Sequence, residues 1–350
     1  MKRKIIILAI LVALIALVGY QILSYFFSAP LYTPTDLRQD STYTHLLKNN
    51  HLEDNSNTFK ISKNISLNYF TKGTGEPVLI IHGGPGIPYH SAWKGLDSLT
   101  SSYKFYYYDQ RGCGKSSRPF DVFEEDNYYN NMMQLHTNLG LPAQISDIEQ
   151  IRQKIGVEKI NIIGHSFGGF LASLYAIEFP EKVKNLVLVT PANVMKMPST
   201  SKGLYDEVED RLPEHLKAEY KEYIKRFLDF NTIFEKSEQQ LIELNKEFIT
   251  YFEAATHNKI KNSLSGIGGW CQYAMFFSMG KVHDYTPYLK QIQIPTLIIY
   301  GEDDIIPLES LTDYLQHIPH AQLKTIKNAS HFPFNEQPIE FGKVVKQAFD

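Results

Sequence analysis

The sequence predicts an α/β protein with a mostly parallel sheet that is covered by helices on both faces. Short, continuous apolar runs recur along the chain, and helical patterns separate several of them. A strand that is buried on both faces of a parallel sheet needs such an apolar run. Strands that alternate with helices imply crossover connections, and these connections cover both faces of the sheet.

The expected strands fall into two parts of the chain. Two alternating stretches come first, at 59–61 and 65–69. The continuous apolar runs follow them at 77–81, 105–108, 160–163, 186–189 and 296–300, and the last expected strand is 322–326. Helical patterns are clearest at 145–155 and 167–177. We therefore expect one α/β core that is built from 58–192 and 290–350.

Residues 193–289 interrupt this alternation. They are charge-rich and helix-like, for example at 204–230 and 235–252, and they contain no buried-strand run. Ligands of open α/β sheets bind outside the carboxyl ends of the strands. An insertion between two sheet strands therefore predicts a helical cap over that edge.

The beginning of the chain has the pattern of a membrane anchor. Residues 1–4 are basic after Met1, and the 23 residues of 5–27 carry no charge. As a helix they would measure roughly 34 Å, enough for a hydrocarbon core of about 30 Å. We expect a single-pass anchor with the catalytic body outside the cytoplasm, followed by a linker at 28–57. A cleaved signal peptide and secretion are the alternative.

Composition excludes several classes of protein. The chain has 350 residues, and its 35 Lys and Arg nearly balance 38 Asp and Glu, which argues against a nucleic-acid binder. Two cysteines build neither a disulfide framework nor a Cys-based zinc site, and the histidines lack metal-ligand spacing. Gly114-Lys115-Ser116 resembles the end of a P-loop, but Asp109 stands where that motif needs glycine. We expect no cofactor and no metal; the oligomeric state is not readable.

The strongest motif is Gly164-His165-Ser166-Phe167-Gly168-Gly169. It fits G-x-S-x-G, follows an expected buried strand and opens an expected helix, as a nucleophile elbow requires. A serine on such a sharp turn exposes its hydroxyl at the edge of the sheet. Ser166 is therefore the expected nucleophile, and a turn serine without a catalytic role is the alternative.

A serine needs a base, and the expected base comes late in the chain after an acid. His331 follows the last expected strand, and three acids follow the strand that ends at Tyr300: Glu302, Asp303 and Asp304. Both positions fall at carboxyl ends of strands, at the same edge as Ser166. His331 is the expected general base, and one of the three acids is expected to orient it.

A glycine-rich segment, His82-Gly83-Gly84-Pro85-Gly86, follows the expected strand at 77–81. Its backbone N–H groups can approach a reacting carbonyl. An oxyanion hole takes one donor from this loop and one from the residue after the nucleophile. The expected pair is the N–H of Gly84 and that of Phe167.

Together with Asp109-Gln110-Arg111-Gly112-Cys113-Gly114-Lys115-Ser116, these motifs resemble the α/β-hydrolase superfamily and, more narrowly, its proline iminopeptidase group. The resemblance covers about 59–350 and implies a Ser-His-Asp triad, no cofactor, and release of an N-terminal residue, often proline, from peptides. By the family's G-x-x-D pattern, the acid maps to Asp304. We expect an acyl-enzyme mechanism on a small peptide or ester substrate.

The sequence departs from that group at several positions. His165 stands where its members usually carry glycine, and Cys113 where serine is usual. Their cap acids bind the substrate amine, and cap carboxylates and aromatic residues are the candidates here: Glu207, Glu209, Glu253, Trp270, Tyr273, Phe276 and Phe277. A carboxylesterase or lipase-like hydrolase is the first alternative. A non-catalytic binding module of the same fold is the second.

Overall fold

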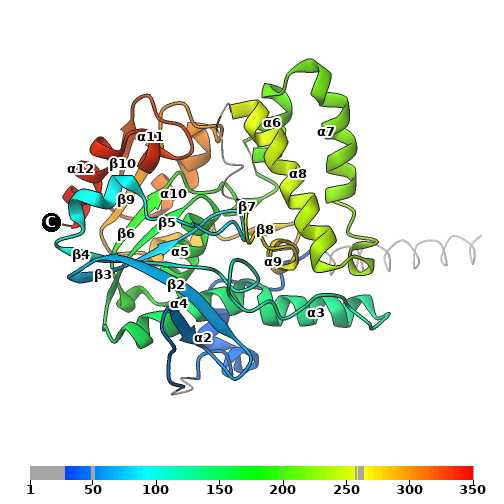
Figure 1. The fold of residues 1–350 in the computed structure, drawn as a ribbon, viewed down its shortest axis with the longest axis horizontal. Helices are drawn as coiled ribbons and strands as arrows, with labels where there is room; N and C mark the ends of the chain where they lie inside the picture. The colour runs from blue at the N-terminus through cyan, green and yellow to red at the C-terminus, as the bar shows by residue number, and fades with distance from the viewer. Residues whose placement is uncertain (1–27, 49–51, 200, 257, 259–263, 350) are drawn as a thin grey trace, which may run out of the picture.

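The computed structural model describes residues 28–48, 52–199, 201–256, 258 and 264–349. Within them, eight strands form one sheet in the order β1-β2-β4-β3-β5-β6-β9-β10 (Figure 1). The pairs β1–β2 and β2–β4 are antiparallel and the others parallel. The strands are β1 (Thr58–Lys60), β2 (Ser66–Gly73), β3 (Glu76–Ile81), β4 (Tyr103–Tyr108), β5 (Ile160–His165), β6 (Val183–Val189), β9 (Thr296–Gly301) and β10 (Ala321–Ile326).

Strand register brings the ends of the parallel strands to one edge. Ile81 of β3 pairs with Gly164 of β5, His165 with Val189 of β6, and Gly301 of β9 with Ile326 of β10. Each of these residues lies at or next to the end of its strand. The segments that follow these strands therefore emerge side by side, as the sequence predicted.

The central strands β3, β5, β6 and β9 are buried on both faces of the sheet, because they are apolar on both sides. Leu79 and Ile81 belong to the larger hydrophobic cluster, whereas Val78 and Ile80 belong to the second. The first cluster packs under α4 (Leu141–Ile155), α5 (Phe167–Glu178) and α10 (Thr312–His317). The second packs under the 3₁₀ helix η2 (Lys94–Leu99) and α12 (Pro338–Phe349). α3 (Tyr128–Leu139) and α11 (Pro333–Glu336) complete the core helices.

The insertion between β6 and β9 forms the expected helical cap (Figure 1). Its helices are α6 (Leu204–Arg211), α7 (Glu214–Phe227), α8 (Glu238–Thr256) and α9 (Trp270–Met279). The helical run expected at 204–230 is split, since Pro213 lacks an N–H and begins a new helix. A two-stranded ribbon, β7 (Lys196–Met197) and β8 (His283–Asp284), adds a pairing that the sequence did not reveal.

Residues 28–48, expected as part of an irregular linker, pack against the core instead. They form α2 (Asp36–Gln39) and the 3₁₀ helix η1 (Ser41–Tyr43), and Tyr32 and Leu37 are buried. The Tyr32 hydroxyl and the Thr35 N–H both donate to Glu178 Oε1 at 2.7 Å. A few buried residues in a polar stretch produce no periodic pattern, so this packing could not be predicted from the sequence.

The predicted fold class also included a membrane-spanning helix at 5–27, and this part is corrected. Residues 5–27 lie outside the described residues. Across the ranges that the structure describes, no helix combines the length and apolar character that a bilayer crossing requires. The supported fold class is the α/β core with its helical cap.

Candidate active site

Ser166 occupies a sharp turn between β5 and α5. Its φ and ψ are 53° and −123°, a backbone conformation that residues other than glycine rarely adopt. The turn is tight on both sides: a Cβ at Gly164 would lie 2.3 Å from the Gly168 carbonyl oxygen, and one at Gly168 would lie 2.2 Å from the Ile81 oxygen. Glycine is therefore needed at both positions, and the G-x-S-x-G spacing follows from this crowding.

His331 and Asp304 meet at the same edge of the sheet. His331 Nδ1 lies 3.0 Å from Asp304 Oδ1 and 3.2 Å from Oδ2. The Asp304 side chain is fully buried, and the Ile306 N–H donates to its Oδ1 at 3.0 Å. The neighbouring acids, Glu302 and Asp303, are exposed. Of the three candidate acids, the structure places Asp304 against the imidazole.

The proposed oxyanion donors flank the nucleophile. A Cβ at Gly83 would lie 2.8 Å from Ser166 Cβ, so the glycine-rich loop runs directly past the serine. Gly84 has a φ of 114°, which favours glycine. Phe167 is the first residue of α5, where an N–H has no acceptor within the helix. The loop of Gly84 and the first residue of α5 therefore both lie next to Ser166.

Ser166, His331 and Gly84 line one cavity of about 490 Å³. Much of its lining is aromatic: Tyr89, Trp93, Phe248, Phe252, Phe332 and Phe334. Among the described lining residues, Glu336 is the only carboxylate, and there is no lysine or arginine. The cavity therefore combines an apolar wall with one acidic group.

The cap residues predicted to bind substrate do not line this cavity. Glu207 lies 3.5 Å from Arg211, and Glu209 lies 3.2 Å from Lys221, so both face basic partners on the cap. Glu253 and the four cap aromatic residues from Trp270 to Phe277 are also absent from the described lining. The cap contributes other residues: Leu204, Phe248, Ile249, Phe252, Asn258 and Leu264.

His165 links the nucleophile turn to the loop of His331. Its Nε2 lies 2.7 Å from the His331 carbonyl oxygen, and its Nδ1 lies 2.6 Å from the Tyr89 hydroxyl. Because a carbonyl only accepts, Nε2 carries the proton and Tyr89 donates to Nδ1. Burial, and then the nearby charge of His331, hold the pKa of His165 well below its ordinary range. His165 is therefore neutral and structural, a role that sequence analysis missed.

The two cysteines of the chain are not paired with each other. Cys113 and Cys271 are both buried and free. Burial raises the pKa of the Cys271 thiol to about 12, and that of Cys113 is also raised. No group of three or more potential metal ligands is found in the described ranges.

The fold agrees with the comparisons to known proteins. The chain belongs to the family described as the alpha/beta hydrolase fold, whose model matches residues 76–338. This membership supports a hydrolase.

More specifically, the chain is 27% identical to the proline iminopeptidase of Heyndrickxia coagulans over 283 residues, 78% of this chain and 90% of that protein. It is 25% identical to the proline iminopeptidase of Saccharolobus solfataricus over 293 residues, 81% of this chain and 87% of that protein. The predicted resemblance to this group is confirmed.

Solved structures share the fold. The proline iminopeptidase of Mycobacterium smegmatis superimposes with a TM-score of 0.51 at 18% identity, over 81% of this chain and 94% of that one. A thermophilic esterase of Thermogutta terrifontis gives a TM-score of 0.54 at 22% identity, over 81% and 92%. At these identities the likenesses show the fold alone.

Proposed function

We propose that the protein is a serine hydrolase with the triad Ser166, His331 and Asp304. The observation that carries this proposal is the contact of His331 Nδ1 with the buried Asp304 carboxylate, in the cavity that the strained Ser166 turn also lines. Because Nδ1 faces the carboxylate, it holds the proton, and Nε2 is free to act as base. Asp304 also stabilises the imidazolium that forms.

The reaction proceeds in two halves. Ser166 Oγ bonds to the substrate carbonyl carbon as its proton moves to His331 Nε2, and the carbonyl electrons move onto the oxygen. The N–H groups of Gly84 and Phe167 stabilise that oxyanion. When the intermediate collapses, His331 gives its proton to the leaving group. Water then releases the acyl group by the same steps.

The substrate that we propose is a peptide with a free N-terminal residue, as for the proline iminopeptidases that this chain resembles. The cavity supports this assignment through charge. A substrate ammonium in a water-poor cavity needs a carboxylate, since an unpaired buried charge costs several kcal/mol. Glu336 is the single carboxylate of the described lining, and it belongs to the core rather than to the cap.

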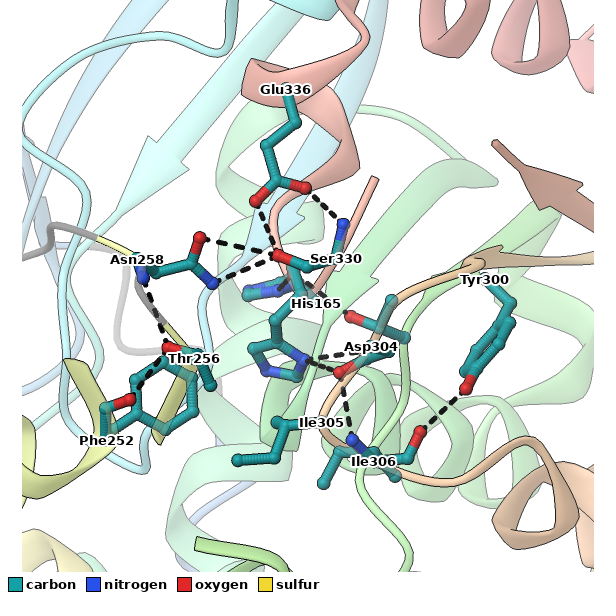
Figure 2. A network of polar contacts seen from close by, with 12 residues as sticks. His165, Phe252, Thr256, Asn258, Tyr300, Asp304, Ile305, Ile306, Ser330 and Glu336 are labelled. Carbon is teal, nitrogen blue, oxygen red and sulfur yellow. Dashed lines mark hydrogen bonds and ion pairs between the residues drawn. The ribbon is translucent and has the colours of Figure 1, made fainter. Parts of the chain in front are cut away.

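Glu336 also has a second role. It accepts from the Ser330 N–H through Oε2 and from the Ser330 hydroxyl through Oε1 at 2.6 Å (Figure 2). Ser330 directly precedes His331. A carboxylate oxygen accepts more than one hydrogen bond, so these contacts leave room for an ammonium donor.

A substrate panel tests the assignment. Prolyl, leucyl and alanyl arylamides with a free amine are compared with their N-acetyl analogues and with short acyl esters. We expect the free prolyl arylamide to be cleaved at least tenfold faster than its acetylated form. Equal rates for both, or cleavage of esters alone, would exclude the aminopeptidase and leave the serine hydrolase standing.

Glu336→Gln separates the two roles of this carboxylate. If Glu336 binds the amine, kcat/KM for the free arylamide falls by about 10- to 100-fold. The ester rate then falls much less. A role confined to holding Ser330 lowers both rates in the same proportion. Glu340→Gln is the matched control, because Glu340 is exposed on α12 and lies 3.7 Å from Lys343.

An esterase is the second candidate, because the cap side of the cavity is apolar. Leu204, Phe248, Ile249 and Phe252 form a surface suited to an acyl chain. In that case the rate follows acyl length and is indifferent to an amine. The same panel therefore distinguishes the two substrates.

A further inference from the structure

The segment from Asp109 to Ser116 has no place in the triad, yet it contacts the loop that carries the proposed oxyanion donor. Gln110 follows β4 and is 1% exposed. Its side-chain amide donates to the His82 carbonyl oxygen at 2.7 Å, and its backbone N–H donates to His82 Nε2 at 3.0 Å. One residue thus holds both the backbone and the ring of His82.

The contact with Gln110 fixes the tautomer of His82. A ring nitrogen that accepts from a backbone N–H carries no proton, so the proton of the neutral ring lies on Nδ1. Nδ1 is 2.9 Å from the Gly83 carbonyl oxygen and therefore donates to it. The ring is fully buried, and burial lowers the pKa of His82 to about 4, which keeps this arrangement at neutral pH.

The Gly83 carbonyl and the Gly84 N–H belong to one peptide unit. In a planar trans peptide the C=O and N–H point in opposite directions. A group that fixes the direction of the oxygen therefore also fixes the direction of the N–H. The Ile87 N–H donates to the same Gly83 oxygen at 3.2 Å, so two donors hold this peptide from one side.

We propose that His82 and Gln110 are positioning residues that aim the Gly84 N–H at the developing oxyanion. The inference rests on the proposed serine hydrolase function, but not on the choice between peptide and ester. It gives the Asp109–Ser116 segment a role: Gln110 selects the His82 tautomer, and His82 orients the donor peptide.

Two substitutions of His82 test its contact with Gly83 and its contact with Gln110 separately. In His82→Asn the side-chain amide nitrogen takes the place of Nδ1, so the donor to Gly83 is kept. In His82→Gln the amide lies near Nε2, so the contact with Gln110 is kept and the donor to Gly83 is lost. His283→Gln is the control, since His283 is a buried histidine outside the site that contacts the Val194 oxygen.

The readout is the inactivation rate by a fluorophosphonate, in which Ser166 Oγ bonds to phosphorus and fluoride leaves with the serine proton. The phosphoryl oxygen then lies in the oxyanion hole. We expect His82→Gln to slow inactivation by about 10- to 100-fold, below the full loss of a donor. His82→Asn loses less than tenfold. Gln110→Met removes only the side-chain donor to the His82 oxygen and keeps the backbone N–H that faces Nε2, so it loses less than tenfold as well. KM for a cleaved arylamide or ester changes less than threefold, because the oxyanion contact forms only in the transition state.

Equal losses in His82→Asn and His82→Gln, in step with lowered thermal midpoints, would overturn the positioning role and leave His82 as a packing residue. Unchanged inactivation in both variants would overturn it as well. Wild-type protein that does not react with the probe contradicts the serine hydrolase itself, which is a separate outcome.

Discussion

The two halves of the cavity are built in different ways. On the core side, Ser166, Gly84 and His331 follow β5, β3 and β10, and the sheet register sets their positions. On the cap side, α8 supplies Phe248 and Phe252 as apolar contacts. The groups proposed to take part in the chemistry, which need precise placement, thus follow strands of the sheet. The apolar side chains that only fill space belong to the cap. Chemistry and selectivity are therefore expected to respond to different mutations.

The largest effect is expected from the core side. Ser166→Ala removes the nucleophile and should lower kcat by roughly 10⁵-fold or more, because the triad acts as a unit. Turnover of any substrate that the wild type cleaves measures it, together with fluorophosphonate labelling. Labelling that persists in this variant would place the nucleophile elsewhere. A wild type that never labels would indicate a binding module.

The next effect separates adjacent acids. Asp304→Asn deprives the His331 imidazole of its buried carboxylate and should lower kcat by roughly 10³- to 10⁴-fold. Asp303→Asn is the matched control. Because the Asp303 side chain is exposed, this substitution is expected to change kcat less than threefold. The reverse order of effects would move the acid by one residue.

The cap side should respond through binding. Phe252 is 3% exposed, lines the cavity, and its ring centroid lies 6.1 Å from that of His331. Phe252→Leu keeps an apolar side chain but removes the ring, and we expect KM to rise about three- to tenfold with a smaller change in kcat. Leu241→Met, a conservative change in the buried cap interior, controls for cap stability. A kcat loss that exceeds the KM change would show that the cap takes part in the chemistry.

The smallest effect on turnover is expected from His136 of α3, which contacts both the cap and the segment 28–48. Its ring contacts Ser278 of α9 at 2.8 Å and the Tyr43 hydroxyl at 2.9 Å. Burial lowers its pKa from 6.5 to about 4. Between these values the unfolded chain binds more protons than the folded protein, so stability is fully present above pH 6.5 and declines as pH falls toward 4. The contribution is roughly 3 kcal/mol at most.

Urea unfolding at pH 7.5, 5.5 and 4.5 measures this dependence. His136→Gln should flatten the decline relative to wild type while activity at pH 7.5 stays within threefold. An equally steep decline in the variant would assign the acid sensitivity to other groups, such as His82.

Sequence patterns predicted that the core-side candidates meet at one edge, because a buried parallel strand needs an apolar run and the residues after it lie at that edge. Ser166 was selected by its G-x-S-x-G motif and His331 by its place after the last strand, and their catalytic roles stay predictions. Three acids follow β9, and only the family pattern selects Asp304. Its role as the catalytic acid stays a prediction, although the structure places it against His331.

For the cap side the sequence predicted a helical insertion, but the seven cap residues that it suggested for substrate binding are absent from the described cavity lining. A helical pattern indicates that a helix forms, but it does not say which face meets the cavity. Glu207 and Glu209 belong to surface ion pairs, whereas Glu336, from the core, faces the cavity. The predicted location outside the cytoplasm depends on 5–27, which lie outside the described residues.

The packing of residues 28–32 changes how freely the cap can pivot. An inserted segment that is joined to its core at two ends has a natural axis of rotation through them. Here the N–H groups of Leu31 and Tyr32 donate to the Ser278 oxygen at the end of α9, and Lys281 and Val282 donate to the Ser28 oxygen. The Tyr32 hydroxyl also donates a hydrogen bond to Glu178 of α5, the helix that follows the nucleophile. Residues 28–32 therefore connect the cap to α5. Rotation about the two joints would have to break this attachment as well as other hydrogen bonds between cap and core, such as that from the Gly268 N–H to the Gly86 oxygen.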